Sequence, residues 1–135
     1  MGNTSHSMLM IKASAGSGKT FNLALRYIEQ LLFSRRPDGL LELRSAAQRQ
    51  YHRHILAITF TNKATDEMKR RIVDELFTLS LPGGDSKYLP YFKANCTPEA
   101  FAKIHEHAAQ ALNDVLFAYS AFNVSTIDSF FQSVM

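Results

Sequence analysis

The chain has 135 residues, of which 46% are hydrophobic and 20% charged, a balance that suits one folded domain and excludes a disordered chain. Its formal net charge of +3 is too small to indicate nucleic acid binding by itself. Cys96 is the single cysteine, so these residues hold no internal disulfide. No apolar run approaches the ~18 residues of a membrane span, and residues 1–6 do not resemble a signal peptide. We therefore expect a cytoplasmic protein without membrane contact.

The first predicted unit is a short strand, a glycine-rich loop and a helix. Residues 8–12 form an apolar run that predicts a strand, and apolar side chains at helical spacing predict a helix over 21–33. The loop between them reads Ala-Ser-Ala-Gly-Ser-Gly-Lys-Thr. A strand before and a helix after are the context that a phosphate-binding (Walker A) loop requires. The apolar residues of the helix are Phe21, Leu25, Ile28 and Leu32.

The residue types of this loop suit a nucleotide. Gly16 and Gly18 let successive backbone N–H groups converge on phosphate oxygens. Lys19 would reach the β- and γ-phosphates, and the Thr20 hydroxyl would ligate Mg²⁺. Ala13 stands where the usual pattern begins with glycine, and the alternative is a turn that caps a helix and binds nothing. The expected nucleotide-binding residues are Ala13, Ser14, Ala15, Gly16, Ser17, Gly18, Lys19 and Thr20.

The middle of the chain alternates breakers, helices and a second strand. Residues 34–39 break the first helix, and 40–53 read as a polar helix with its arginines exposed. An almost wholly apolar run predicts a strand over 55–60 that is covered on both faces. The next helix is predicted over 63–79. Its buried stripe consists of Ala64, Met68, Ile72, Leu76 and Leu79.

The last third predicts one long helix and a third strand. Residues 86–96 read as irregular, and Thr97 with Pro98 reads as the start of a helix that runs to about residue 119. A strand over 122–127 follows, and another helix begins near Ser129. Three apolar strands that alternate with helices predict an α/β fold with a parallel sheet. A domain seldom stops in the first turn of a helix, so we expect a piece of a longer protein.

Polar residues follow the second and third predicted strands. Thr61 and Asn62 come after one strand and Asp128 after the other, at the sheet edge where ligands of open α/β sheets bind. Hydroxyls, an amide and the Phe60 ring suit phosphates and base faces without sequence readout. The alternatives are structural, because Asn62 or Asp128 could cap a helix and Phe60 could lie in the core.

Together the three motifs resemble those of the UvrD/Rep/RecB helicases of superfamily one, most closely the AddA/RecB-type helicase–nucleases. Residues 13–20 are similar to motif I, in which alanine at the first position is usual. Residues 58–72 are similar to motif Ia, and 124–130 to the motif often written Thr-x-His-Ser-Phe. Asp128 stands where many members have His. Only residues 1–7 precede the first strand, where many members carry an adenine-reading Gln.

The resemblance implies an incomplete RecA-like P-loop NTPase lobe, with residues 1–135 as the N-terminal part of the ATP-binding domain. It implies ATP and Mg²⁺ as cofactors, with Lys19 and Thr20 in catalytic roles and Thr20 on the metal. It also implies 3′→5′ travel on single-stranded DNA in recombination or double-strand break repair, and a partner in the form of a second helicase–nuclease chain. The acids and arginines that complete catalysis lie downstream in this family, so we expect little turnover here. The implied DNA contacts are Phe60, Thr61, Asn62, Thr126, Asp128 and Phe130.

Two other classes of function stay open at this point. A self-contained small P-loop NTPase or phosphotransferase would use Asp128 as its Mg²⁺ acid. A non-catalytic nucleotide-binding module would use the same lobe to recruit a partner. His105 and His107 look like metal ligands, but residues two apart diverge on a helix, so we expect a solvated face.

Overall fold

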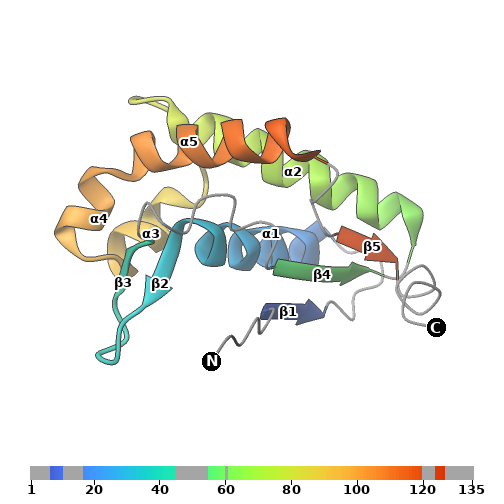
Figure 1. Cartoon of the computed structure of the whole chain (residues 1–135), viewed down its shortest axis with the longest axis horizontal. Helices are drawn as coiled ribbons and strands as arrows, with labels where there is room; N and C mark the ends of the chain where they lie inside the picture. The colour runs from blue at the N-terminus through green and yellow to red at the C-terminus, as the bar shows by residue number, and fades with distance from the viewer. Residues whose placement is uncertain (1–6, 11–16, 45–54, 60, 120–123, 127–135) are drawn as a thin grey trace.

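A computed structural model describes residues 7–10, 17–44, 55–59, 61–119 and 124–126 (Figure 1). Strands and helices both occur along these ranges, in a mixed α/β arrangement. The elements in chain order are β1 (Ser7–Met10), α1 (Ser17–Leu32), β2 (Phe33–Arg35), β3 (Leu41–Leu43), β4 (Ile55–Thr59), α2 (Asn62–Ser80), α3 (Leu89–Asn95), α4 (Pro98–Ala102), α5 (Ile104–Phe117) and β5 (Val124–Thr126).

Three strands form a sheet in the order β1-β4-β5, with both neighbouring pairs parallel. In the register, Met10 of β1 lies opposite Ile58, and Thr59 of β4 lies opposite Thr126 of β5. The strands lie where the apolar runs predict them, although positions 11, 12, 60, 122, 123 and 127 are outside the described residues. Because the strands are parallel, their carboxyl ends meet at one edge.

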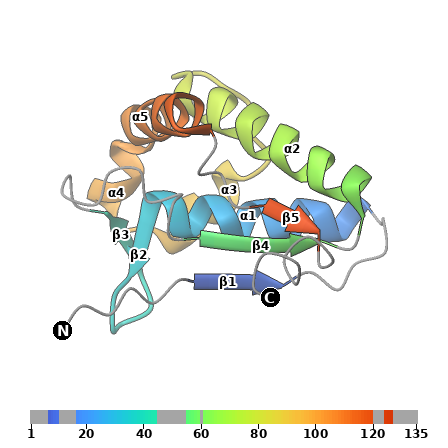
Figure 2. The same ribbon diagram turned by 45° about the vertical axis from the view of Figure 1, so that its right-hand side comes forward.

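The two long helices that follow β1 and β4 cover the sheet. α1 contacts β1 and β4, α2 contacts β4 and β5, and the two helices pack against each other, which places them on the same face. α5 lies side by side with α2 in both views (Figures 1 and 2). None of the helices in the described ranges combines the length and apolar character needed to cross a membrane.

The core lies between these helices and the sheet. The predicted stripe of α2 is confirmed at Met68, Ile72, Leu76 and Leu79, which are fully buried, while Ala64 is half-buried. The helix itself is found one residue longer at each end than the predicted 63–79. α1 buries Ile28 and Leu32 as predicted, and it ends at Leu32 rather than at position 33. The α1 residues fully or nearly buried in this core are Leu23, Ala24, Tyr27, Ile28, Leu31 and Leu32.

The predicted helix over 40–53 is wrong at its start, because Leu41–Leu43 is the strand β3, paired antiparallel with β2. Leu41 is fully buried and the next residue, Glu42, is exposed, because successive side chains of a strand point to opposite faces. Gly39 has φ 92°, a left-handed conformation that glycine adopts without strain, and it closes the hairpin turn. Arg44, expected to be exposed, is half-buried, and its Nε donates to the Gln30 carbonyl oxygen at 2.8 Å. Positions 45–53 lie outside the described residues.

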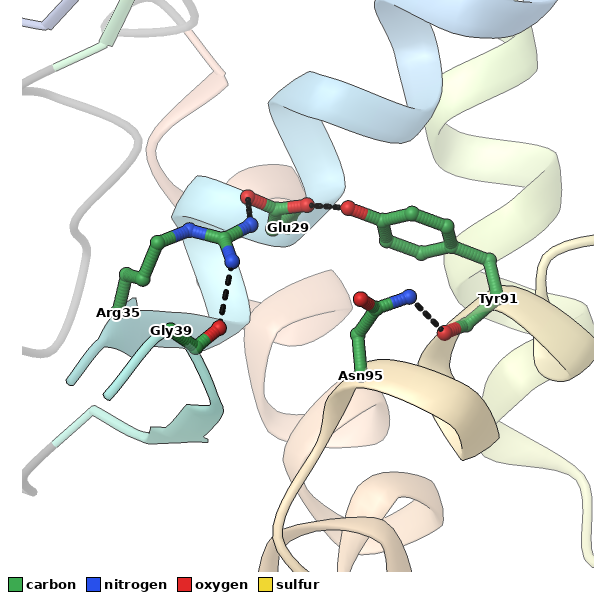
Figure 3. Close-up of polar contacts among 5 residues, drawn as sticks. All are labelled: Glu29, Arg35, Gly39, Tyr91 and Asn95. Carbon is green, nitrogen blue, oxygen red and sulfur yellow. Dashed lines mark hydrogen bonds and ion pairs between the residues drawn. The ribbon is translucent and has the colours of Figure 1, made fainter. Parts of the chain in front are cut away.

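A polar cluster connects the β2–β3 hairpin to α1 and, through Glu29, to α3 (Figure 3). Glu29 of α1 is nearly buried and accepts from Arg35 of β2 at 3.0 Å and from the Tyr91 hydroxyl of α3 at 2.5 Å. Arg35 also donates to the Gly39 carbonyl oxygen at 2.6 Å, across the hairpin turn. A buried carboxylate thus has partners from two other elements, as a buried charge requires.

Two more predictions are corrected in the segment after α2. The predicted irregular stretch over 86–96 contains α3, whose Pro90 stands in the first turn, where its missing N–H costs no hydrogen bond. The single helix predicted to start at Thr97 is two helices, α4 and α5, separated at Lys103. The start itself is confirmed, because the Thr97 hydroxyl accepts from the Ala100 N–H at 3.2 Å.

Candidate functional site

The three sequence motifs are connected to one edge of the sheet. β1 ends at Met10 and α1 begins at Ser17, while β4 ends at Thr59 and α2 begins at Asn62. The third motif begins with β5, which ends at Thr126. The three strands are parallel neighbours, so their carboxyl ends lie at the same edge of the sheet (Figure 2). This edge is where an open α/β sheet holds its ligands.

The glycine-rich motif ends in the first turn of α1. Ser17, Gly18, Lys19 and Thr20 are helical, and α1 therefore begins four residues earlier than its apolar stripe. The first N–H groups of a helix have no partner within it, and they carry partial positive charge, so this turn suits a phosphate. The remaining predicted nucleotide ligands, Ala13, Ser14, Ala15 and Gly16, lie outside the described residues.

The second motif forms a sharp strand-to-helix corner that Thr61 caps. Thr61 has the extended backbone of an N-cap (φ −131°, ψ 157°), and its hydroxyl accepts from the Ala64 N–H at 3.0 Å. Its carbonyl oxygen accepts from the Thr65 N–H at 3.0 Å. The alternative that Asn62 is the cap is wrong, because Asn62 is the first helical residue and is exposed. The side chain of Asn62 is therefore not committed to the helix end.

Two further threonine hydroxyls brace this corner. Thr59, only 2% exposed, has its Oγ1 2.6 Å from Thr65 Oγ1, so one hydroxyl donates to the other. Each of the two oxygens also lies 3.2 Å from the Thr61 carbonyl oxygen. We call Thr59, Thr61 and Thr65 the threonine corner. Sequence reasoning missed Thr65, although a threonine four residues after an N-cap lies one helical turn away and faces it.

The structure places three of the six expected DNA contacts, and Phe60, Asp128 and Phe130 lie outside the described residues. Thr61 and Asn62 are exposed at the start of α2. Thr126 lies opposite Thr59 in the register and is only 7% exposed. The second and third motifs are thus adjacent in space, and Thr61 and Asn62 present the more accessible polar groups.

The other candidate ligands have structural partners. His105 Nδ1 lies 2.7 Å from the Leu79 carbonyl oxygen, and His107 Nε2 lies 3.3 Å from that of Arg44. Among the described residues, no group of three or more His, Cys, Asp or Glu side chains could hold a metal ion. Cys96 is nearly buried, and this burial, reinforced by the Glu29 charge, raises the pKa of its thiol to about 11. A neutral thiol is a weak nucleophile and a weak ligand.

The sequence as a whole matches the UvrD/REP helicase N-terminal domain over residues 2–135. The chain belongs to this family, which the three motifs at one sheet edge also indicate.

Named relatives give the comparison more detail. The chain is 31% identical over 133 residues to the RecB component of the RecBCD enzyme of Buchnera aphidicola subsp. Acyrthosiphon pisum, a match that covers 93% of this chain and 10% of that protein. It is 33% identical over 127 residues to an ATP-dependent helicase/nuclease protein of Streptococcus sanguinis, covering 94% of this chain and 8% of that protein. A shorter match, 42% over 66 residues, is to RecB of Chlamydia pneumoniae, covering 49% and 5%. The chain thus spans about a tenth or less of these relatives. No solved structure matches it.

Proposed function

We propose that this chain is the N-terminal part of the motor of an ATP-dependent helicase–nuclease, where it binds ATP with Mg²⁺ and contacts single-stranded DNA. The observation that carries the proposal is that β1, β4 and β5, the strands that run into the three motifs, end at one carboxyl edge of a parallel sheet. Family membership supports it, and the names of the relatives supply the helicase/nuclease role. The lobe to which the chain contributes is then of the RecA-like P-loop type.

The nucleotide lies at the start of α1 in this proposal. The backbone of Ala13, Ser14, Ala15, Gly16, Ser17 and Gly18 surrounds the phosphates, and the first turn of α1 adds unpaired N–H groups. Lys19 would neutralise charge on the β- and γ-phosphates, and the Thr20 hydroxyl would hold Mg²⁺. When bound, Mg²⁺ would supply further neutralisation of the phosphate charge. We also propose adenine as the base, because the resemblance to the family implies ATP as the nucleotide.

The DNA strand lies along the neighbouring junctions. Thr61 and Asn62 present a hydroxyl and an amide at the exposed start of α2, and Thr126 lies beside them in the adjacent strand. Phe60, Asp128 and Phe130 complete the set of contacts. Polar contacts to the backbone and stacking on aromatic rings ignore base identity, as a translocating motor requires. Travel in the 3′→5′ direction and a role in recombination or break repair are proposed from the resemblance of the motifs to the family. A partner chain is proposed because the relatives are named as parts of larger enzymes.

Nucleotide binding is tested by titrating a fluorescent ATP analogue with Mg²⁺ into the 135-residue chain. We expect weak, saturable binding that Lys19→Ala reduces by at least about tenfold, because a charged phosphate contact is worth more than ~1.4 kcal/mol. Lys93→Ala is the matched control, since Lys93 is exposed in the last turn of α3. Binding that is equal in all three proteins would contradict the proposed site.

DNA binding is tested with a labelled single-stranded oligonucleotide at two salt concentrations. We expect Asn62→Ala to weaken binding by about fivefold, and Asn113→Ala, an exposed asparagine on α5, to leave it unchanged. Steady-state ATP hydrolysis should be low with and without the oligonucleotide. Robust turnover that requires Lys19 and Asp128 but ignores DNA would favour the self-contained NTPase instead.

A further inference from the structure

Tyr88 connects the turn after α2 to the beginning of α1. Its side chain is fully buried, and its hydroxyl donates to the main-chain carbonyl oxygen of Phe21 at 2.8 Å. Its ring packs edge-on against the Phe21 ring, with centroids 4.6 Å apart. Phe21 directly follows Thr20. The hydroxyl therefore holds the backbone at the point where the glycine-rich motif ends.

The same tyrosine is tied to α2 on its other side. The Ser86 hydroxyl donates to the Glu75 carboxylate of α2 at 2.8 Å and accepts from the Tyr88 N–H at 3.1 Å. Burial raises the pKa of the Tyr88 phenol, and Glu75 raises it further, while the charge and hydrogen bonding of Arg71 oppose them. Tyr88 is thus linked to Glu75 of α2 through Ser86, and its hydroxyl reaches α1.

A phenylalanine would fill the same space, so packing alone does not explain the hydroxyl. A buried hydroxyl costs free energy unless it is hydrogen-bonded, and here its acceptor is a backbone carbonyl in the first turns of α1. Helix starts fray easily because their first N–H groups are unpaired. The Tyr88 hydroxyl, a donor from outside α1, fixes the backbone at Phe21, directly after the turn that contains Lys19 and Thr20.

We propose that Tyr88 is a positioning residue that holds the beginning of α1 at Phe21, directly after Lys19 and Thr20, and so keeps these two residues preorganised for a nucleotide phosphate. The inference rests on the proposed function, because it assigns a role at the same nucleotide site. It also joins that site physically to the helix whose start carries the predicted DNA contacts Thr61 and Asn62.

The test compares two tyrosines that differ in where they reach α1. Tyr91, like Tyr88, donates its hydroxyl to α1, but to the Glu29 side chain further along the helix. We expect Tyr88→Phe to weaken binding of the Mg²⁺-bound ATP analogue by about three- to tenfold, the worth of one hydrogen bond. Tyr91→Phe should leave that affinity within about twofold. Both variants should bind the oligonucleotide as the unchanged chain does.

Amide hydrogen exchange without nucleotide separates this inference from the proposed function. The amides of residues 21–25 should exchange about three- to tenfold faster in Tyr88→Phe and not in Tyr91→Phe. Unchanged exchange in Tyr88→Phe, or equal loss of nucleotide affinity in both variants, would overturn the positioning role. Absence of nucleotide binding by the unchanged chain, with the exchange difference present, would refute the nucleotide site while leaving Tyr88 as the restraint on α1.

Discussion

At the scale of single residues, the threonine corner shows how a short polar sequence sets the start of a helix. β4 ends at the buried Thr59, Thr61 caps α2, and the Thr65 hydroxyl in the first turn of the helix hydrogen-bonds with both. Hydroxyls suit this task because each can donate and accept at once. The backbone next to the exposed Asn62 is therefore fixed by hydrogen bonds of Thr61 and Thr65.

Loss of the Thr61 cap should be measurable in the stability of the chain. Thr61→Ala removes the acceptor of the Ala64 N–H, and we expect the free energy of unfolding to fall by about 1 kcal/mol. Thr78→Ala is the control, because the Thr78 hydroxyl donates to the Asp74 carbonyl oxygen within the same helix and caps nothing. Urea unfolding of both variants measures the difference; equal losses would show that Thr61 acts as an ordinary surface threonine.

Cys96 gives a prediction for alkaline pH. The folded chain raises the pKa of this thiol from 9.0 to about 11, so it retains a proton that the unfolded chain has lost. Its contribution to stability is therefore fully present below pH ~9 and declines as the pH rises to about 11. We expect the unfolding free energy of Cys96→Ala to depend less steeply on pH in this window than that of the unchanged chain. Parallel slopes in urea titrations at pH 8, 9.5 and 11 would contradict the assignment.

At the scale of elements, the β2–β3 hairpin is anchored by an ion pair with a carboxylate of α1. Its strands have three residues each, too few for independent stability. Glu29 of α1 supplies the anchor: its side chain is 11% exposed, whereas that of Arg35 is 48% exposed. The neighbouring pair Arg36–Asp38, also at 3.0 Å, has both side chains in water, 41% and 48% exposed. The hairpin thus forms one half-buried ion pair with α1 and one surface ion pair within its own turn.

A double-mutant cycle should distinguish these two pairs. We expect a coupling free energy of about 1 kcal/mol between Glu29→Gln and Arg35→Ala, because one partner is largely withdrawn from water. The cycle between Arg36→Ala and Asp38→Ala should give less than ~0.5 kcal/mol, since exposed pairs are screened and cost side-chain entropy. Coupling energies that are equal within error would mean that the burial of Glu29 does not strengthen its pair with Arg35.

At the scale of the whole molecule, nucleotide binding and folding should be linked. A ligand that binds only the folded chain stabilises it by about 2.7 kcal/mol at one hundred times its dissociation constant. We therefore expect Mg²⁺ with an ATP analogue to raise the melting temperature by several degrees, and Lys19→Ala to abolish this shift. Lys93→Ala should retain it. A shift that survives in Lys19→Ala would place the ligand elsewhere on the molecule.

The parts of the fold that could be predicted are those with long repeated patterns. α2 is found almost at its predicted bounds because Met68, Ile72, Leu76 and Leu79 repeat the helical period over several turns. The hairpin was missed because Leu41–Leu43 is too short to show a period, and Leu, Glu and Arg also favour helices. α3 was missed although Pro90 marked its first turn. The break at Lys103 leaves the apolar spacing of Phe101, Ile104 and Ala108 in phase, so no pattern reveals it.

The candidate site divides in the same way. The glycine-rich motif and the polar residues Thr61 and Asn62 could be proposed as ligand contacts from the sequence, because their residue types carry the chemistry locally; these roles stay predictions. Thr65 and Tyr88 could not, since their roles depend on contacts with Thr59 and with Phe21 that only the folded chain creates. Sequence motifs therefore name the groups that would touch a ligand, and the structure adds those that hold them.

Thr59 and Thr126 are direct partners across β4 and β5, so their proximity is set by strand pairing and not by the length of chain that separates them. Residues could be gained or lost in the connections among α2, α3, α4 and α5 without moving either threonine. One residue inserted inside β4 or β5 would instead turn every side chain beyond it to the opposite face of the sheet. We therefore expect changes in length to be tolerated better in the connections between the helices than inside these two short strands.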